Sequence, residues 1–302
     1  MLDSAHSSHQ SRFIKVRDGT SLHVTHWPAP RSAARPVLCL PGLTRNGRDF
    51  ADVAAALSSG ADARDVFALD ARGRGRSQWA RDWRSYSIPT ETQDVIDVMA
   101  ALGLADTAIL GTSRGGIIAM ILAAIQPGAI GAVVMNDIGP VIERTGLMRI
   151  AGYVGRMPVP VSWDDATRTV AEVSRKAFPA VPADVWPRVA RAWFNEQNGR
   201  PAPGYDPALG RSFSSTDATP PALWGQFGAL KRVAVLVVRG ETSDLLSAAT
   251  VADMQQRHPN CARLEVKGQG HAPLLMDAPS INALRGFLND ADAGRSVAGR
   301  VY

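Results

Sequence analysis

The sequence predicts a doubly wound α/β fold, in which helices cover both faces of a mostly parallel β-sheet and a helical cap is inserted late in the chain. Three observations lead to this prediction. Short apolar runs alternate with helical patterns in the first half of the chain, and the alternation resumes near the C-terminus. The runs are apolar at successive positions, as in strands of a parallel sheet with both faces buried. Between residues 141 and 221 the alternation stops.

The chain is expected to open with an antiparallel hairpin. Strands are predicted at Phe13–Val16 and Ser21–Trp27, with the turn-forming pair Asp18-Gly19 between them. Such a hairpin commonly forms the antiparallel edge of a larger sheet. The polar segment Met1–Ser11 precedes it and is expected to be disordered or loosely attached.

The alternating elements that follow build the sheet and its helical layers. Crossovers between successive parallel strands are right-handed, which gives a doubly wound sheet. The tail after Asp290 is expected to be frayed. The elements predicted in order are strand Pro36–Leu40, helix Asp49–Leu57, strand Val66–Leu69, helix Thr90–Leu102, strand Ala108–Leu110, a helix ending at Ile125, strand Ala132–Met135, strand Val233–Val238, helix Ala248–Arg257, strand Leu264–Val266 and helix Ser280–Leu288.

The segment 141–221 contains no convincing strand pattern. It shows helical patterns at Thr167–Ala177 and Ala183–Asn195 and is rich in tryptophan, methionine and proline. It is too long for a simple connection and too apolar for a linker. We therefore predict a helical cap at 141–221, inserted into a core formed by 1–140 and 222–302.

Composition narrows the classes of function. Lysine and arginine total 33 against 28 acidic residues, a net charge of +5, but the arginines are scattered and no nucleic-acid-binding module is evident. The two cysteines, Cys39 and Cys261, cannot form a disulfide framework. With no apolar run of membrane-spanning length, we expect a cytoplasmic protein that binds neither nucleic acid nor membrane. No metal-ligand spacing or dinucleotide fingerprint occurs, so no metal or cofactor is implied.

The sequence Gly111-Thr112-Ser113-Arg114-Gly115 has the pattern of a nucleophile elbow. It follows an apolar strand and opens an apolar helix, which is the context in which this pattern presents a serine hydroxyl above a sheet. Ser113 is expected to adopt a strained conformation with positive φ, and the flanking glycines allow close backbone approach. Ser113 is therefore the candidate nucleophile.

A serine nucleophile needs a base and an acid that orients the base. His271 follows strand Leu264–Val266 through a glycine-containing loop and is the favoured base. Asp244, after strand Val233–Val238, is the favoured acid. Its rivals are Glu241, which follows the same strand too closely to reach across, and Asp137, which borders the insertion.

Four patterns occur in order along the chain: Pro41-Gly42-Leu43, Asp70-Ala71-Arg72-Gly73-Arg74-Gly75-Arg76-Ser77, Gly111-Thr112-Ser113-Arg114-Gly115 and Gly270-His271. Together they resemble the motifs of the α/β-hydrolase superfamily, specifically its cap-bearing esterase and lactonase-like members. The resemblance spans nearly the whole chain. One departure is Pro41, which stands where that family carries a histidine.

The resemblance implies an oxyanion hole formed by the backbone N–H groups of Leu43 and Arg114. The loop Asp70–Ser77 is interpreted as a structural turn. Arg45, Arg72 and Trp163 are candidate substrate contacts. For the arginines near the site, including the Arg114 side chain, the alternative is an ordinary solvated surface position.

These residues together favour a serine hydrolase of carboxylic esters or lactones that acts through an acyl-enzyme on a small-molecule substrate. Carbon–carbon bond hydrolysis or perhydrolysis by the same three residues is the nearest enzymatic alternative. A non-catalytic member that binds a small ligand under the cap is the alternative from another class. The sequence fixes neither the substrate nor the oligomeric state.

Overall fold

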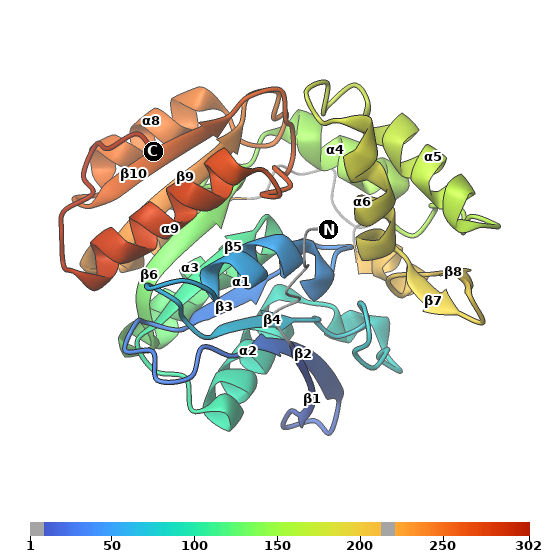
Figure 1. Cartoon of the computed structure of the whole chain (residues 1–302), viewed down its shortest axis with the longest axis horizontal. Helices are drawn as coiled ribbons and strands as arrows, with labels where there is room; N and C mark the ends of the chain where they lie inside the picture. Colours follow the sequence, from blue (N-terminus) through green and yellow to red (C-terminus); the bar gives the residue numbers. More distant parts are fainter. Residues whose placement is uncertain (1–8, 213–220) are drawn as a thin grey trace.

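The computed structural model describes residues 9–212 and 221–302, and it is built around an eight-stranded sheet (Figure 1). The strand order is β1-β2-β4-β3-β5-β6-β9-β10, and all neighbours are parallel except the pairs made by β2. This confirms the predicted fold class. The strands are β1 Gln10–Lys15, β2 Ser21–Trp27, β3 Val37–Leu40, β4 Val66–Leu69, β5 Thr107–Thr112, β6 Ile130–Asn136, β9 Ala234–Gly240 and β10 Cys261–Val266.

Alternate side chains of each central strand pack into separate layers, because successive residues of a strand point to opposite faces. Leu38 and Leu40 of β3 pack in the layer that includes α2 (Ile88–Leu102), α3 (Arg114–Ile125) and α8 (Ala248–Arg257). Val37 and Cys39 pack in the opposite layer, with α1 (Ala51–Leu57) and α9 (Ala278–Asp292). Both cysteines are buried and free.

Helix α2 carries two acidic residues that matter below, and local signals fix its position. The Ser87 hydroxyl accepts a hydrogen bond from the Thr90 N–H, a typical N-cap. A proline lies in the first turn, and Gly103 ends the helix in the left-handed conformation. The helix therefore starts two residues before its predicted beginning at Thr90.

The chain between β6 and β9 forms a second layer of structure, which we call the cap segment (residues 141–212). Figure 1 shows its helices gathered at one side of the sheet. Ala166, Val170, Trp186, Val189 and Phe194 form an apolar cluster of their own. The expectation of no strands here is wrong, since a short antiparallel hairpin is present. The elements are α4 Arg144–Tyr153, α5 Trp163–Ser174, α6 Trp186–Trp193, β7 Asn195–Gln197 and β8 Arg200–Ala202, and the chain re-enters the core through α7 Trp224–Gly228.

The C-terminal tail is packed, contrary to the predicted fraying. Val297 is fully buried, and Val301 forms a bridge with Arg263 beside β10. The Tyr302 hydroxyl donates a hydrogen bond of 2.6 Å to Asp290. The tail therefore closes the far edge of the sheet.

The predicted disorder of the N-terminal segment can be compared with the structure for its last residues only. Of the segment Met1–Ser11, residues 1–8 lie outside the described part of the chain, whereas Gln10 and Ser11 belong to β1. Across residues 9–212 and 221–302, none of the helices combines the length and the apolar character needed to cross a bilayer.

Candidate active site

Ser113 lies at the corner between β5 and α3, with φ 51° and ψ −113°. The two glycines that flank it are sterically required. A Cβ on Gly115 would overlap the carbonyl oxygen of Leu40, and one on Gly111 would lie 2.6 Å from the carbonyl carbon of Gly115. The positive φ of Ser113 and the close backbone approach agree with the sequence prediction for this corner.

His271 reaches Ser113 from the loop after β10. Its Nε2 lies 3.0 Å from the Ser113 Oγ, and its Nδ1 lies 2.8 Å from Oδ2 of Asp137. The His271 side chain is almost completely buried and that of Asp137 is fully buried. Three side chains from three different strand ends therefore form one hydrogen-bonded chain.

The carboxylate of Asp137 is held by the core. Its Oδ1 accepts the N–H of Gly240 at 2.8 Å, and its Oδ2 accepts the hydroxyl of Ser243 at 2.5 Å. The backbone N–H of Asp137 donates to the carbonyl of Val238, and its φ of 55° turns the side chain away from the strand direction. Both oxygens are thus occupied in a geometry that points Oδ2 at His271.

The expectation that Asp244 orients His271 is wrong in the structure. Asp244 accepts two hydrogen bonds from Arg149 of α4, from Nε at 2.6 Å and from Nη2 at 2.8 Å. These bonds keep the pKa of Asp244 below its usual value, although burial opposes the shift. Asp137 takes the place beside His271 because it follows β6, the strand next to β5, directly and is fixed to the end of β9.

Leu43 follows Gly42, which packs against Ser113, and Arg114 is the residue after Ser113. Arg114 is the first residue of α3, and the first amides of a helix have no acceptor within the helix. Gly42 packs so closely that a Cβ there would lie 3.7 Å from the Ser113 Cβ, which brings the adjacent Leu43 amide to the same corner. The oxyanion hole formed by these two backbone N–H groups stays a prediction.

A cavity of about 2200 Å³ opens between the strand ends and the cap segment, with Ser113 and His271 on its wall. Arg45 and Trp163 also line it, as expected of substrate contacts. Arg45 is paired with Asp49 and lies over the Trp193 ring, 4.3 Å from its centroid. The Trp163 Nε1 donates to the Gly199 carbonyl at 3.1 Å. Both side chains are therefore held in fixed positions.

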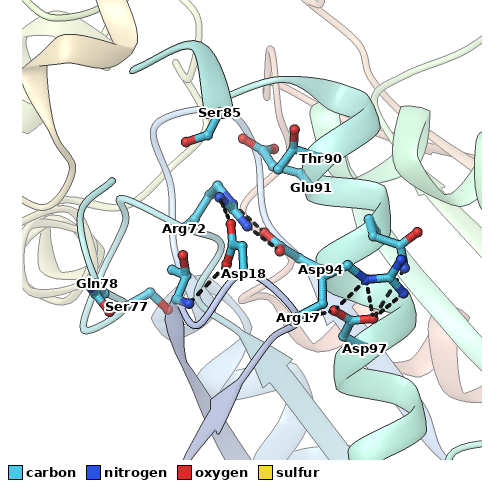
Figure 2. Close-up of polar contacts among 12 residues, drawn as sticks. Arg17, Asp18, Arg72, Ser77, Gln78, Ser85, Thr90, Glu91, Asp94 and Asp97 are labelled. Carbon is cyan, nitrogen blue, oxygen red and sulfur yellow. Dashed lines mark hydrogen bonds and ion pairs between the residues drawn. The ribbon is translucent and has the colours of Figure 1, made fainter. Parts of the chain in front are cut away.

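Arg72 is not on the cavity wall, which makes the prediction that it contacts substrate wrong. It is 2% exposed and binds Asp94 through Nε at 2.6 Å and Nη2 at 2.5 Å, with Asp18 as a further partner (Figure 2). The alternative of a solvated surface arginine is also wrong for Arg72, and for Arg114, whose side chain is bound to Glu91.

Two polar residues of the site were missed in the sequence. The Asn136 Nδ2 donates to the Pro273 carbonyl at 3.0 Å, which ties the His271 loop to β6. Ser243 orients Asp137, as described above. The pair Asn136-Asp137 directly after an apolar strand was a usable signal, whereas nothing distinguishes Ser243 from other loop serines. Within the described ranges, no group of three or more His, Cys, Asp or Glu side chains is placed to hold a metal ion.

Comparison with known proteins places this geometry in a family. The family model described as the alpha/beta hydrolase fold matches residues 35–278. The 3-hydroxybutyrate-oligomer hydrolase of Cupriavidus necator is 33% identical over 291 residues, which cover 92% of this chain and 97% of that protein. Lipase LipV of Mycobacterium tuberculosis is 31% identical over 184 residues, which cover 59% of this chain and 64% of the lipase.

A solved structure agrees over a similar span. The crystal structure of an alpha/beta hydrolase from Novosphingobium aromaticivorans superimposes with a TM-score of 0.86 at 37% identity, and the match covers 94% of this chain and 99% of that one. The family model spans most of the sequence. The chain belongs to the α/β-hydrolase family.

Proposed function

We propose that the protein is a serine hydrolase that cleaves carboxylic esters through an acyl-enzyme. The observation that carries the proposal is the chain of contacts from Ser113 Oγ to His271 Nε2 at 3.0 Å, and from His271 Nδ1 to Asp137 Oδ2 at 2.8 Å. A serine hydroxyl becomes an effective nucleophile only when a base accepts its proton, and a carboxylate stabilises the imidazolium that forms. A cytoplasmic location remains part of this proposal.

The reaction proceeds in two halves. Ser113 Oγ attacks the ester carbonyl carbon while its proton passes to His271 Nε2, and the carbonyl oxygen becomes an oxyanion bound by the N–H groups of Leu43 and Arg114. His271 then gives the proton to the leaving alkoxide, which departs as an alcohol. Water attacks the acyl-enzyme, loses its proton to His271 and releases the carboxylic acid, and Ser113 recovers its proton from His271.

The substrate class we favour is an oligomeric ester of hydroxy acids. The cavity volume of about 2200 Å³ exceeds the roughly 300–1,000 Å³ of sites that bury a single drug-sized ligand, which suits a substrate of several linked units. The relative from Cupriavidus necator is named for hydrolysis of 3-hydroxybutyrate oligomers and matches nearly the full length of this chain. Lactones remain a second substrate class within the same chemistry.

A substrate series with a nucleophile variant tests this proposal. Wild type and Ser113→Ala are assayed on 3-hydroxybutyrate dimer, trimer and tetramer, on short p-nitrophenyl esters and on acyl lactones. Wild type should hydrolyse the oligomers with the highest kcat/KM, and a fluorophosphonate should label wild type but not Ser113→Ala. The ester hydrolase proposal fails if wild type is neither labelled nor active on any ester.

Two other outcomes of these assays would indicate one of the alternative functions. Labelling of Ser113 with turnover only of vinylogous 1,5-diketones, or only of peroxide with a carboxylic acid, would identify carbon–carbon bond hydrolysis or perhydrolysis. Binding of an oligomer without labelling or turnover would identify a ligand-binding member of the fold.

A further inference from the structure

A buried ion cluster lies behind the two proposed oxyanion donors. It consists of Arg74 from the loop after β4, Glu91 from the first turn of α2, and Arg114 at the start of α3. Glu91 Oε1 accepts from Arg74 Nη1 at 2.7 Å and from Arg114 Nη2 at 3.1 Å, while its Oε2 accepts from Arg114 Nε at 2.6 Å. The side chains of Arg74 and Glu91 are 1% and 2% exposed, so these contacts are shielded from water.

The cluster is joined to both donor residues. Arg74 Nε donates a hydrogen bond of 2.7 Å to the carbonyl oxygen of Leu43, whose own N–H is one proposed donor. Arg114 supplies the other donor with its backbone N–H and is anchored by its side chain. One carboxylate thereby connects two segments that meet at Ser113 but come from different strands.

The pairing of β3 with β5 places these segments side by side as far as Leu40 and Gly111. Pro41, at the start of the oxyanion segment, has no backbone N–H and no polar side chain. Because Arg74 binds the Leu43 carbonyl, rotation of the peptide group that follows Leu43 is restrained. Arg114 Nη2 also donates a hydrogen bond of 3.0 Å to the Tyr86 carbonyl, which further restrains the Arg114 side chain.

The two arginines of the cluster determine the charge of Glu91. Burial alone would raise the pKa of Glu91, but the guanidiniums of Arg74 and Arg114 outweigh burial and hold this pKa below its usual value. Glu91 is therefore a carboxylate at neutral pH. Without its charge, two guanidiniums would face one another in a space with little water, and they would separate to restore hydration.

We propose that Arg74, Glu91 and the Arg114 side chain position the oxyanion hole, setting the direction of the Leu43 and Arg114 N–H groups that bind the developing negative charge. The three are positioning residues, since they act through the two backbone amides. This inference rests on the proposed serine hydrolase function. Removal of one oxyanion donor typically lowers kcat by about 10²–10³-fold, so misdirecting two of them partly should lower kcat by roughly 10–100-fold.

The chain offers a matched control on the same helix. Asp94 lies one turn after Glu91 on α2, is also buried, and accepts hydrogen bonds from Arg72 Nε at 2.6 Å and Arg72 Nη2 at 2.5 Å (Figure 2). The side-chain hydrogen bonds to Asp94 come from Arg72 rather than from Arg74 or Arg114, which bind Glu91. Glu91→Gln removes a buried carboxylate from two arginines, and Asp94→Asn removes one from Arg72, which Asp18 also binds, so Asp94→Asn controls for the loss of a buried carboxylate on α2.

The test compares kcat and KM of the two variants on an ester that wild type hydrolyses. Glu91→Gln should lower kcat at least about tenfold with KM within about twofold, because the oxyanion exists only after substrate has bound. Affinity for a trifluoromethyl ketone analogue, which forms a tetrahedral adduct at Ser113, should fall by the same factor. Asp94→Asn should keep kcat within about threefold of wild type.

A second variant covers loss of folding in Glu91→Gln. Arg74→Lys keeps a positive charge beside Glu91, but its single ammonium cannot reproduce the guanidinium geometry that reaches both Glu91 and Leu43. It should lower kcat with a Tm near that of wild type. The proposal is overturned if Arg74→Lys or a folded Glu91→Gln keeps wild-type kcat, or if Asp94→Asn loses as much kcat as Glu91→Gln.

The two proposals fail in different ways. If wild type neither hydrolyses esters nor is labelled at Ser113, the hydrolase proposal falls, and the positioning role falls with it. If wild type is active and labelled while the Arg74 and Glu91 variants match its kcat, only the positioning role is wrong.

Discussion

Gly115 occupies a position where any side chain would collide with the sheet. Its Cα approaches the carbonyl of Leu40 so closely that a Cβ has no room, and the obstacle is backbone that cannot rotate away. Gly225 in α7 differs, because a Cβ there meets no atom within 4 Å. Replacement of these two glycines by alanine should therefore change the stability of the protein in opposite directions.

We predict that Gly115→Ala lowers the free energy of unfolding by about 2 kcal/mol or more, as overpacking commonly does. Gly225→Ala should raise it by up to about 1 kcal/mol, because alanine has fewer conformations to lose from the unfolded chain than glycine. Urea denaturation followed by circular dichroism measures both. Equal transition midpoints for the two variants would show that the corner at Ser113 is not tightly packed.

Ser113 and His271 were found in the sequence because each lies in a local pattern, an elbow and a glycine-rich loop. No local sequence pattern distinguishes Asp137 from Asp244. Both follow strands that end at the same edge of the sheet, so spacing alone left both open. The left-handed φ of 55° at Asp137 and its bond to the Gly240 N–H decide which carboxylate faces His271.

At the scale of elements, Arg149 and Asp244 connect α4 of the cap segment to the loop after β9. Both side chains are partly exposed, 41% and 30%, so we expect a modest contribution to stability. Because Arg149 holds the pKa of Asp244 below the unfolded value of about 3.9, the pair stabilises the protein above about pH 4. This contribution is lost as the pH falls through the lower folded-state pKa.

We therefore predict that Asp244→Asn lowers Tm at pH 7, and that its difference from wild type begins to shrink below about pH 4 and disappears below the folded-state pKa of Asp244. Arg149→Met should cause a similar loss, and the double variant should lose no more than either single change. Thermal melts across pH measure this. A constant Tm difference at every pH would rule out the ion pair as its cause.

Most strands and helices of the core were predictable because their apolar periodicity is strong, while the short elements were not. Strands β7 and β8 have three residues each and too few apolar positions for a pattern. The pair Asn198-Gly199 between them was a usable hairpin signal, and both residues have positive φ. The tail is held by isolated anchors such as Val297, which leave no periodic trace.

At the scale of the molecule, Arg48 joins the cap segment to the core. From the turn before α1 its Nη2 donates to the carbonyls of Ala192 and Phe194 and to the Asn195 side chain, at 3.3, 3.2 and 2.9 Å. These carbonyls lie at the end of α6, where helix geometry leaves them without internal partners. The division into a core of 1–140 and 222–302 and a cap of 141–221 stays a prediction.

We predict that Arg48→Met increases amide hydrogen exchange in α6 by at least about tenfold and leaves β5 and β6 unchanged. Arg188→Met is the control, because the pair of Arg188 with Asp52 is exposed and surface pairs contribute little. Hydrogen exchange followed by mass spectrometry measures α6 separately from β5 and β6. Equal protection of α6 in Arg48→Met and wild type would contradict an anchoring role.

The proposed reaction depends on one hydrogen-bonded chain of three side chains from three strand ends. Its acid, Asp137, is the member that the sequence did not favour. The rate of ester hydrolysis by Asp137→Asn, set beside that of Asp244→Asn, tests it most directly. Asp137→Asn should lower kcat roughly 10³–10⁴-fold with the fold intact, as replacing the acid of such a triad does. Asp244→Asn should stay within about tenfold of wild type, and the reverse ranking of the two variants would contradict the account.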